Sequence, residues 1–297
     1  MVNSHQQIEK MVEQNAVRVI PRLDIKGPNL VKGIHFEGLR VLGAPEQFAR
    51  HYYEKGADEL LYVDVVASLY ERNSLHELIT NTAQNIFIPL TVSGGIRSID
   101  DIRGVLRAGA DKVSLNTAAI KNPQIIEKAA RVFGSSTIVI TIEAIKHQDG
   151  KYYAYSDNGR EYSGIEVLQW AKKVEELGAG EIVVSSVDRE GTGAGYDVAL
   201  TRMISSAVNI PVVAHGGPGK VEHIGDVIID GKADAVAVAS MIHYDFVGKN
   251  QTEKAHSKEG NVEFLQSGSK VSKIQTLDLR EIKKYLIRLG IPCRCGF

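Results

Sequence analysis

The chain carries one pattern of motifs twice. Residues 91–120 read as a strand, a glycine loop, a helix and a second strand, and residues 212–242 repeat that order, so that Gly94-Gly95 corresponds to Gly216-Gly217. DELLYVDVV at 58–66 is echoed in the same way by GEIVVSSVD at 180–188. The spacing between the copies is far longer than the repeat of a solenoid protein, so each copy is predicted to form half of one fold.

Short apolar segments rich in Val and Ile alternate with helical patterns along both halves. The expected strands are 17–23, 60–65, 87–92, 112–115, 137–142, 182–185, 212–214 and 235–238, and helical spacing of apolar residues is found at 45–55, 98–108, 123–133, 165–177 and 276–289. Near-continuous apolar runs are typical of parallel strands that are buried on both faces. Eight such strand-helix units predict an α/β fold, a single (β/α)8 barrel over residues 1–297, with site residues at the carboxyl ends of the strands.

Three segments fall outside this repeat. Residues 1–15 are polar and lack the apolar core of a signal peptide, so they are interpreted as an N-terminal extension. Residues 146–160 alternate and contain Asp-Gly and Asn-Gly, which predicts a β-hairpin after the fifth strand. Residues 248–272 are polar and rich in Lys, Gly and Ser, and are interpreted as a surface insertion before the last helix.

Composition argues against several classes of protein. The net charge of −1 gives no electrostatic footprint for nucleic acid, and no apolar run approaches the roughly 20 residues that cross a membrane. Cys293 and Cys295 are the two cysteines, which is too few for a disulfide framework and, as a pair of ligands, too few for a metal site. We therefore expect no metal, no cofactor and a location in the cytoplasm.

Two carboxylates and two glycine loops are the candidates for chemistry. Asp24 and Glu143 follow strands one and five, which face each other across a barrel mouth, and could act as an acid and base pair or instead pair with neighbouring lysines. The loops at Gly94-Gly95 and Gly216-Gly217 precede helices and could bind phosphates through backbone N–H groups, although glycine also marks ordinary turns. Thr117 and Ser240, after strands four and eight, would add hydroxyl donors.

Four charged residues of alternating sign mark the opposite end of the barrel. Arg18, Glu59, Lys112 and Glu181 lie at the starts of strands one, two, four and six. They are expected to meet in a ring, which could be a structural plug or a gate over a channel through the barrel.

Several of these motifs together resemble one known family. LVKGIHFEGLR, IPLTVSGGIRS, GADKVSLNTAA and VVSSVDREGTGAGYD are similar to the cyclase subunit of imidazole glycerol phosphate synthase, HisF, more than to the related isomerase HisA. The resemblance implies that a glutaminase subunit docks at the N-terminal face and makes ammonia, which passes the ring. The ammonia then attacks PRFAR, a ribulosyl aminoimidazole carboxamide ribonucleotide with two phosphates, to give imidazole glycerol phosphate and AICAR.

The resemblance also assigns roles to residues of this chain. Asp24 and Glu143 become the catalytic pair, and Arg18, Glu59, Lys112 and Glu181 become the ammonia gate. The implied phosphate- and substrate-binding residues are Lys32, Gly94, Gly95, Asn116, Thr117, Ser186, Gly191, Thr192, Gly216, Gly217 and Ser240.

The chain departs from the family pattern at the expected mouth. Glu143 stands where the family has a second catalytic aspartate, His215 replaces a serine, and Glu190 replaces an aspartate. PRLDIKGPNLVKG together with Glu143 is similar to a paralogue branch linked to the amidination of surface-polysaccharide sugars. In that branch a HisF-like barrel delivers ammonia from a glutaminase to a separate sugar amidotransferase, which is the alternative function.

Overall fold

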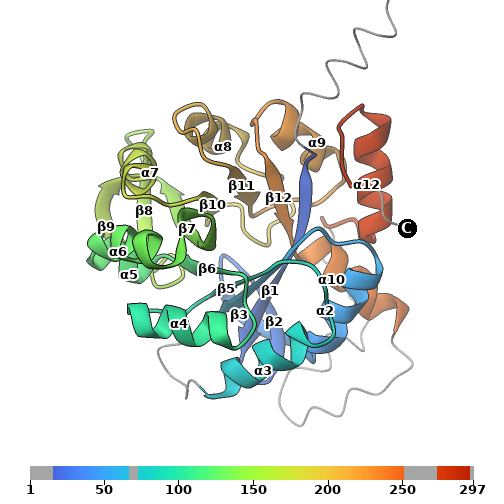
Figure 1. Cartoon of the computed structure of the whole chain (residues 1–297). Coiled ribbons are helices and arrows are strands. Elements are labelled where there is room, and N and C mark those ends of the chain that lie inside the picture. Colours follow the sequence, from blue (N-terminus) through green and yellow to red (C-terminus); the bar gives the residue numbers. More distant parts are fainter. Residues whose placement is uncertain (1–15, 67–72, 251–272, 295–297) are drawn as a thin grey trace, which may run out of the picture.

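Eight parallel strands close into a barrel (Figure 1), as the half-repeat predicts. The computed structural model describes residues 16–66, 73–250 and 273–294. The barrel strands, in order, are β1 (Arg18–Lys26), β4 (Leu60–Asp64), β5 (Leu90–Ser93), β6 (Lys112–Leu115), β7 (Ile138–Lys146), β10 (Glu181–Ser186), β11 (Val212–His215) and β12 (Ala235–Val238). β12 pairs with β1, with Arg18 beside Ala235, and this pairing closes the barrel.

Helices follow the strands and cover the outside of the barrel (Figure 1). They are α2 (Pro45–Glu54), α3 (Asn73–Ala83), α4 (Ile99–Arg107), α5 (Thr117–Lys121), α6 (Gln124–Phe133), α7 (Val167–Glu176), α8 (Val198–Ser205), α9 (Glu222–Ile229), α10 (Ser240–Lys249) and α12 (Leu279–Arg288), with a short 3-10 turn at Ser135–Thr137. Helix α4 shows why these segments are helical. The Ser98 side chain caps its first turn by accepting from the Asp101 N–H, and Ile102 and Val105 are buried against the strands.

The barrel interior is built in layers by residues that alternate along each strand. A central apolar layer consists of Ile20, Leu61, Val139, Val183, Val213, Ala235 and Ala237. Because side chains two apart on a strand share a face, Arg18 lies on the interior side below Ile20, and Arg22 and Asp24 lie above it. The apolar layer therefore separates a charged group at the N-terminal end from another at the carboxyl end.

Two antiparallel hairpins extend the barrel at its carboxyl end. The predicted hairpin at 146–160 is confirmed, since β7 pairs with β8 (Tyr152–Ser156) and β8 pairs with β9 (Glu161–Glu166). A second hairpin, β2 (Asn29–Ile34) with β3 (Glu37–Gly43), continues β1 and was not expected from the sequence. Its turn places His35 and Phe36 at positive φ of 52° and 59°, a conformation that non-glycine residues adopt only when other contacts hold it.

Some predicted boundaries differ from the structure. The strand expected at 87–92 begins only at Leu90, and Phe87 is 80% exposed. Helix α10 continues to Lys249, so the first residues of the expected insertion at 248–272 are helical. Residues 251–272 of that insertion and the extension at 1–15 lie outside the described residues, as does Cys295. Cys293 is held in place by a parallel bridge with Val17.

Candidate active site

Asp24 and Glu143 lie at the carboxyl ends of β1 and β7, but their surroundings differ. Both are buried, at 2% and 7% exposure. Glu143 lines a cavity of about 600 Å³ at the barrel mouth, whereas Asp24 is not among the residues that line it. The sequence-based expectation that both carboxylates face one open space is therefore met by Glu143 alone.

Asp24 is held in its ionised form by two cations. Arg22 Nε donates to Asp24 Oδ1 at 2.8 Å, and Lys32 Nζ lies 3.7 Å from Asp24 Oδ2. Burial by itself would raise the pKa of Asp24, but the charges of Arg22 and Lys32 and the hydrogen bond from Arg22 outweigh it and hold the pKa below its usual value.

The pKa of Glu143 is shifted in the opposite direction. Burial raises its pKa to about 7, and a hydrogen bond from the Gly159 N–H to Oε2, at 2.8 Å, offsets this effect only in part. Carboxyl groups whose environments push their pKa values apart are suited to divide acid and base roles. At neutral pH this site therefore offers a partly protonated Glu143 and an ionised Asp24.

Arg22, on β1, contacts residues of β10 and β11. It was not identified as a candidate from the sequence. Its Nη1 lies 3.1 Å from His215 Nδ1 and 3.4 Å from Ser185 Oγ, and its guanidinium lies 5.1 Å from the centre of the Phe36 ring. Burial and the charge of Arg22 keep the pKa of His215 well below its usual value, so the imidazole is neutral and its Nδ1 can accept from Arg22. The available signal was its place in the β1 alternation, two residues before Asp24.

Lys32 lies on β2 and is 2% exposed, which buries it completely in an ion pair with Glu190. Glu190 Oε2 also accepts from the Phe36 N–H at 3.0 Å, and the Glu190 carbonyl accepts from the His35 N–H at 3.0 Å. These bonds fix the β2–β3 hairpin against the loop between β10 and α8. In this structure Lys32 is thus directed at Glu190 and Asp24 and not at open space.

The first expected phosphate loop opens onto the mouth cavity. The cavity is lined by Gly94, Gly95, Asn116 and Thr117, together with Arg22 and Glu143. Gly94 has φ of 97°, and a Cβ there would lie 2.3 Å from the Asp64 carbonyl oxygen, so only glycine fits. The Asn116 Oδ1 atom is buried and has no hydrogen-bond partner among the residues that the structure describes.

The second expected phosphate loop is closed. The crevice beside it has room for only about 10 Å³ and is lined by Gly191, Gly216, Gly217 and Ser240. Lys32 and Glu190 form part of its remaining wall. Ser186 and Thr192 line neither space: Ser186 Oγ is buried, and Thr192 Oγ1 donates to the Arg189 carbonyl at 2.7 Å. The two loops that correspond in sequence therefore differ in accessibility.

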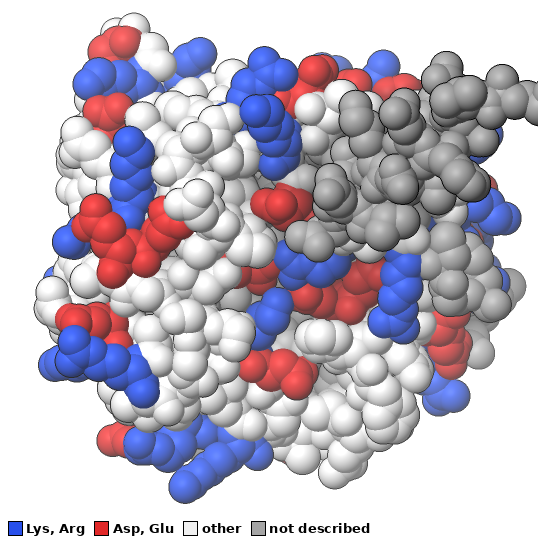
Figure 2. All heavy atoms as spheres, turned by 45° about the horizontal axis from the view of Figure 1, so that its top comes forward, with Lys and Arg blue, Asp and Glu red and all other residues white. Residues whose placement is uncertain are grey.

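The four charged residues at the N-terminal end meet in a ring, as expected. Arg18 Nη1 lies 2.6 Å from Glu59, Lys112 Nζ lies 3.2 Å from Glu59 and 3.1 Å from Glu181, and Arg18 also pairs with Glu181. β1 begins near the top of Figure 1, so Figure 2, which turns that side forward, shows acidic and basic side chains beside one another on this end of the barrel. Each cation of the ring contacts both carboxylates, so the charges balance.

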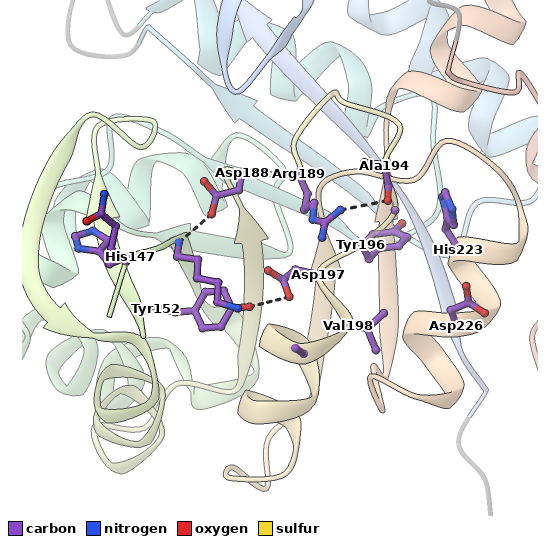
Figure 3. Close-up of a pocket in the computed structure, with 14 residues that line it drawn as sticks. His147, Tyr152, Asp188, Arg189, Ala194, Tyr196, Asp197, Val198, His223 and Asp226 are labelled. Carbon is purple, nitrogen blue, oxygen red and sulfur yellow. Dashed lines mark hydrogen bonds between the residues drawn. The ribbon is translucent and has the colours of Figure 1, made fainter. Parts of the chain in front are cut away.

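A further groove of about 740 Å³ lies outside the mouth and contains none of the expected site residues. Figure 3 shows it between the end of β7, the loop that leads into α8, and the start of α9. Tyr152 donates to Asp197 at 3.1 Å within it. Across the described parts of the chain, no group of acidic, His or Cys side chains is arranged to hold a metal ion. No helix in the same parts is long and apolar enough to span a membrane.

Comparison with known proteins identifies relatives of this chain. Residues 18–247 match the histidine biosynthesis protein family. Curated HisF subunits of imidazole glycerol phosphate synthase are similar as well: one from Legionella pneumophila is 56% identical over 206 residues, covering 69% of this chain and 97% of its own. One from Alkaliphilus metalliredigens is 47% identical (77% and 91%), and one from Methanocaldococcus jannaschii is 43% identical (93% and 98%). With a closed barrel and this level of identity over most of its length, the chain belongs to the HisF family.

Proposed function

We propose that this chain is the ammonia-using cyclase subunit of an imidazole glycerol phosphate synthase, a lyase that converts PRFAR and ammonia to imidazole glycerol phosphate and AICAR. The observation that carries the proposal is the pair of buried carboxyl groups with opposite pKa shifts at the mouth, in a chain that is 43% or more identical to three HisF subunits. An acid and a base in fixed positions are what ring closure and bond cleavage by proton transfer require.

The two carboxyl groups have distinct roles in this proposal. Asp24, ionised beside Arg22, takes protons from the attacking ammonia, and Glu143, protonated up to a pH of about 7, gives a proton to the departing group. Glu143 lines the cavity and so can reach a bound substrate directly. Asp24 does not line the cavity and is paired with Arg22 and Lys32, so it needs a small rearrangement of either cation to reach the substrate.

In this proposal the two phosphate groups of the substrate bind to two loops that differ in accessibility. Gly94, Gly95 and Thr117 offer an open site, and Gly216, Gly217 and Ser240 offer a closed one. The Lys32–Glu190 pair forms the wall of the closed crevice, so binding of the second phosphate requires that pair to separate and the β2–β3 hairpin to move. Lys32 released from Glu190 would then pair with the phosphate.

The glutaminase partner is proposed to dock on the N-terminal face, around the ring of Arg18, Glu59, Lys112 and Glu181. Phe87 supports this assignment, because it precedes β5 on the same end of the barrel and is 80% exposed there. Aromatic side chains are enriched among the residues of protein–protein interfaces, so Phe87 is a candidate anchor for the partner. Ammonia released at this face would pass the ring and the apolar layer before it reaches Glu143.

The test is turnover of PRFAR by the isolated chain with an ammonium salt as the nitrogen source. The proposal predicts release of AICAR and imidazole glycerol phosphate without a glutaminase. A folded chain that binds phosphate but releases no AICAR at any pH between 6 and 9 would refute it.

One observation favours a second candidate function. Glu190 forms part of the crevice where a second phosphate would bind and makes the site electrically neutral with Lys32. A barrel that keeps its ring but binds no doubly phosphorylated substrate would suit delivery of ammonia to a separate amidotransferase that acts on a polysaccharide sugar. In that case the chain would still stimulate its glutaminase, and PRFAR would not be turned over.

A further inference from the structure

Arg22 presents donors to the mouth cavity that nothing in the described structure uses. It is 2% exposed and lines the cavity together with Gly94, Gly95 and Glu143. Its Nε is bonded to Asp24 and its Nη1 contacts His215 and Ser185. Among the described residues, no hydrogen-bond partner is found for its Nη2. No atom of Arg22 is among the buried polar atoms without a partner in the described residues, so Nη2 opens on the cavity, where a bound ligand can supply its acceptor.

The guanidinium is also held rigidly. Asp24 fixes one edge, the neutral His215 imidazole accepts at a second point, and the Phe36 ring lies 5.1 Å from the guanidinium carbon. Phe36 is in turn stacked against His215, with ring centres 6.3 Å apart. These contacts come from β1, β11 and the β2–β3 hairpin, so the direction of the remaining donors is set before any ligand binds.

The rest of the cavity restricts which acceptor fits. Asn116 offers a buried Oδ1 that lacks a donor, and its Nδ2 is already bonded to the Tyr155 carbonyl at 3.2 Å. Glu143 lines the same cavity, and Asp24 is bonded to Arg22 Nε. A carboxylate or phosphate placed against Arg22 would bring a further negative charge to these carboxyl groups. A carboxamide is neutral and offers both an oxygen for Arg22 and an N–H group for Asn116.

We propose that Arg22 is a substrate-binding residue that donates hydrogen bonds to the carboxamide oxygen of the ligand, while the phosphate of the same ligand lies at Gly94-Gly95. This role rests on the proposed cyclase function, whose substrate and product both carry an aminoimidazole carboxamide. Arg22 thereby selects ligands by their carboxamide, and the glycine loop selects by phosphate alone.

The experiment compares two probes that differ in the carboxamide. AICAR carries both a phosphate and a carboxamide, and ribose 5-phosphate carries the phosphate only. Calorimetric titration of the full chain is expected to show tighter binding of AICAR. Arg22→Lys keeps a positive charge beside Asp24 but loses the second nitrogen of the fork. Loss of a hydrogen bond to a charged donor weakens binding by about tenfold to a hundredfold, so AICAR affinity should fall by that factor and ribose 5-phosphate affinity should stay unchanged.

Two further variants serve as controls. Ser185→Ala removes the long 3.4 Å contact to Arg22 and the 3.0 Å contact to His215 Nδ1, and leaves the bonds from Arg22 to Asp24 and His215 in place, so both affinities should stay close to those of the wild type. Arg22→Met should match Arg22→Lys for AICAR if the fork, and not the charge, makes the contact. Circular dichroism and thermal unfolding establish that each variant is folded, and a variant that does not fold is replaced by Arg22→Gln, which keeps an N–H donor of shorter reach.

Three results would overturn the proposal. They are equal affinity of the wild type for the two probes, an unchanged AICAR affinity in Arg22→Lys, and an equal loss for both probes, which would place Arg22 at the phosphate. The proposed function fails separately, through absence of PRFAR turnover by the wild type. A chain that discriminates AICAR through Arg22 but does not turn over PRFAR would retain the binding role and lose the cyclase.

Discussion

The barrel contains two groups of charged residues, one on each side of the apolar layer, and the two groups differ in their balance of charges. At the N-terminal end, Arg18 and Lys112 each contact both Glu59 and Glu181, and two positive charges balance two negative ones. At the mouth, Arg22 and Lys32 are paired with Asp24 and Glu190, which leaves Glu143 as an additional carboxyl group bonded to a backbone N–H.

pH-dependent chemistry is therefore expected at the mouth and not at the ring. A ring in which two cations are paired with two carboxylates suits a seal or a gate. An additional buried carboxyl group with a pKa of about 7 changes its proton content near neutrality, as a general acid must. We therefore expect changes at the mouth to alter turnover, and changes at the ring to alter the supply of ammonia.

The largest expected effect comes from Asp24→Asn. The substitution removes the base but keeps a side chain of the same shape beside Arg22 and Lys32. General base catalysis contributes about 10²- to 10⁴-fold, so ammonia-dependent turnover of PRFAR should fall by that order. Titration with inorganic phosphate should show unchanged binding. If the variant retains more than a tenth of wild-type turnover, Asp24 is not the general base.

Glu143→Gln should change how stability depends on pH. The pKa of Glu143 rises from 4.5 to about 7 on folding, so between these values the folded chain keeps a proton that the unfolded chain has lost. Stability contributed by the protonated group is therefore lost as pH rises through this window, by an amount on the order of 3 kcal/mol. Urea unfolding at pH 5 and pH 8 should show this loss in the wild type and a smaller one in Glu143→Gln. Equal losses in both would mean that burial does not shift this carboxyl group.

Lys112→Glu changes the ring at the N-terminal end and leaves the mouth as it is. Three carboxylates around Arg18 would break the balance of the ring, so turnover with glutamine and the glutaminase should fall at least tenfold because both docking and ammonia passage are disturbed. Turnover with added ammonium should stay near the wild-type value, because the mouth is untouched. Lys128→Glu, the same charge reversal on the exposed face of α6, is the matched control and should leave both activities unchanged.

How much of this could be predicted from the sequence depends on the kind of interaction. The half-repeat and the eight alternating strand and helix patterns were sufficient to predict a closed barrel, because a local pattern reports local structure. The ring was predictable too, since strand starts in a barrel share one end. The hairpin formed by β2 and β3 was missed, because its turn at His35 and Phe36 carries no glycine at the positive-φ positions.

The network around Arg22 was beyond sequence reasoning for a different reason. Its partners lie on β10, β11 and the β2–β3 hairpin, up to 193 residues away along the chain. His215 and Glu190 stood out in the sequence only as separate departures from the family pattern. The structure shows that both lie against the cations of the mouth, His215 beside Arg22 and Glu190 beside Lys32. Such pairings depend on strand register and on a hairpin whose position was not anticipated.

The smallest expected effect is that of Phe87→Ser. Truncation of an exposed aromatic anchor should weaken binding of the glutaminase subunit by about tenfold, since an anchor residue contributes 1 kcal/mol or more. The free energy of unfolding of the isolated chain should change by less than about 0.5 kcal/mol, because the side chain is in solvent. Analytical ultracentrifugation of the mixture measures the first quantity. Unchanged affinity would place the partner elsewhere on this face.

The most direct test of the whole account measures AICAR release from PRFAR in one assay series, with ammonium or with glutamine and the glutaminase, for the wild type, Asp24→Asn and Lys112→Glu. We predict that Asp24→Asn loses both activities and that Lys112→Glu loses only the glutamine-dependent one. If the wild type releases no AICAR with ammonium, or if Lys112→Glu loses the two activities equally, the assignment of chemistry to the mouth and of ammonia supply to the ring is contradicted.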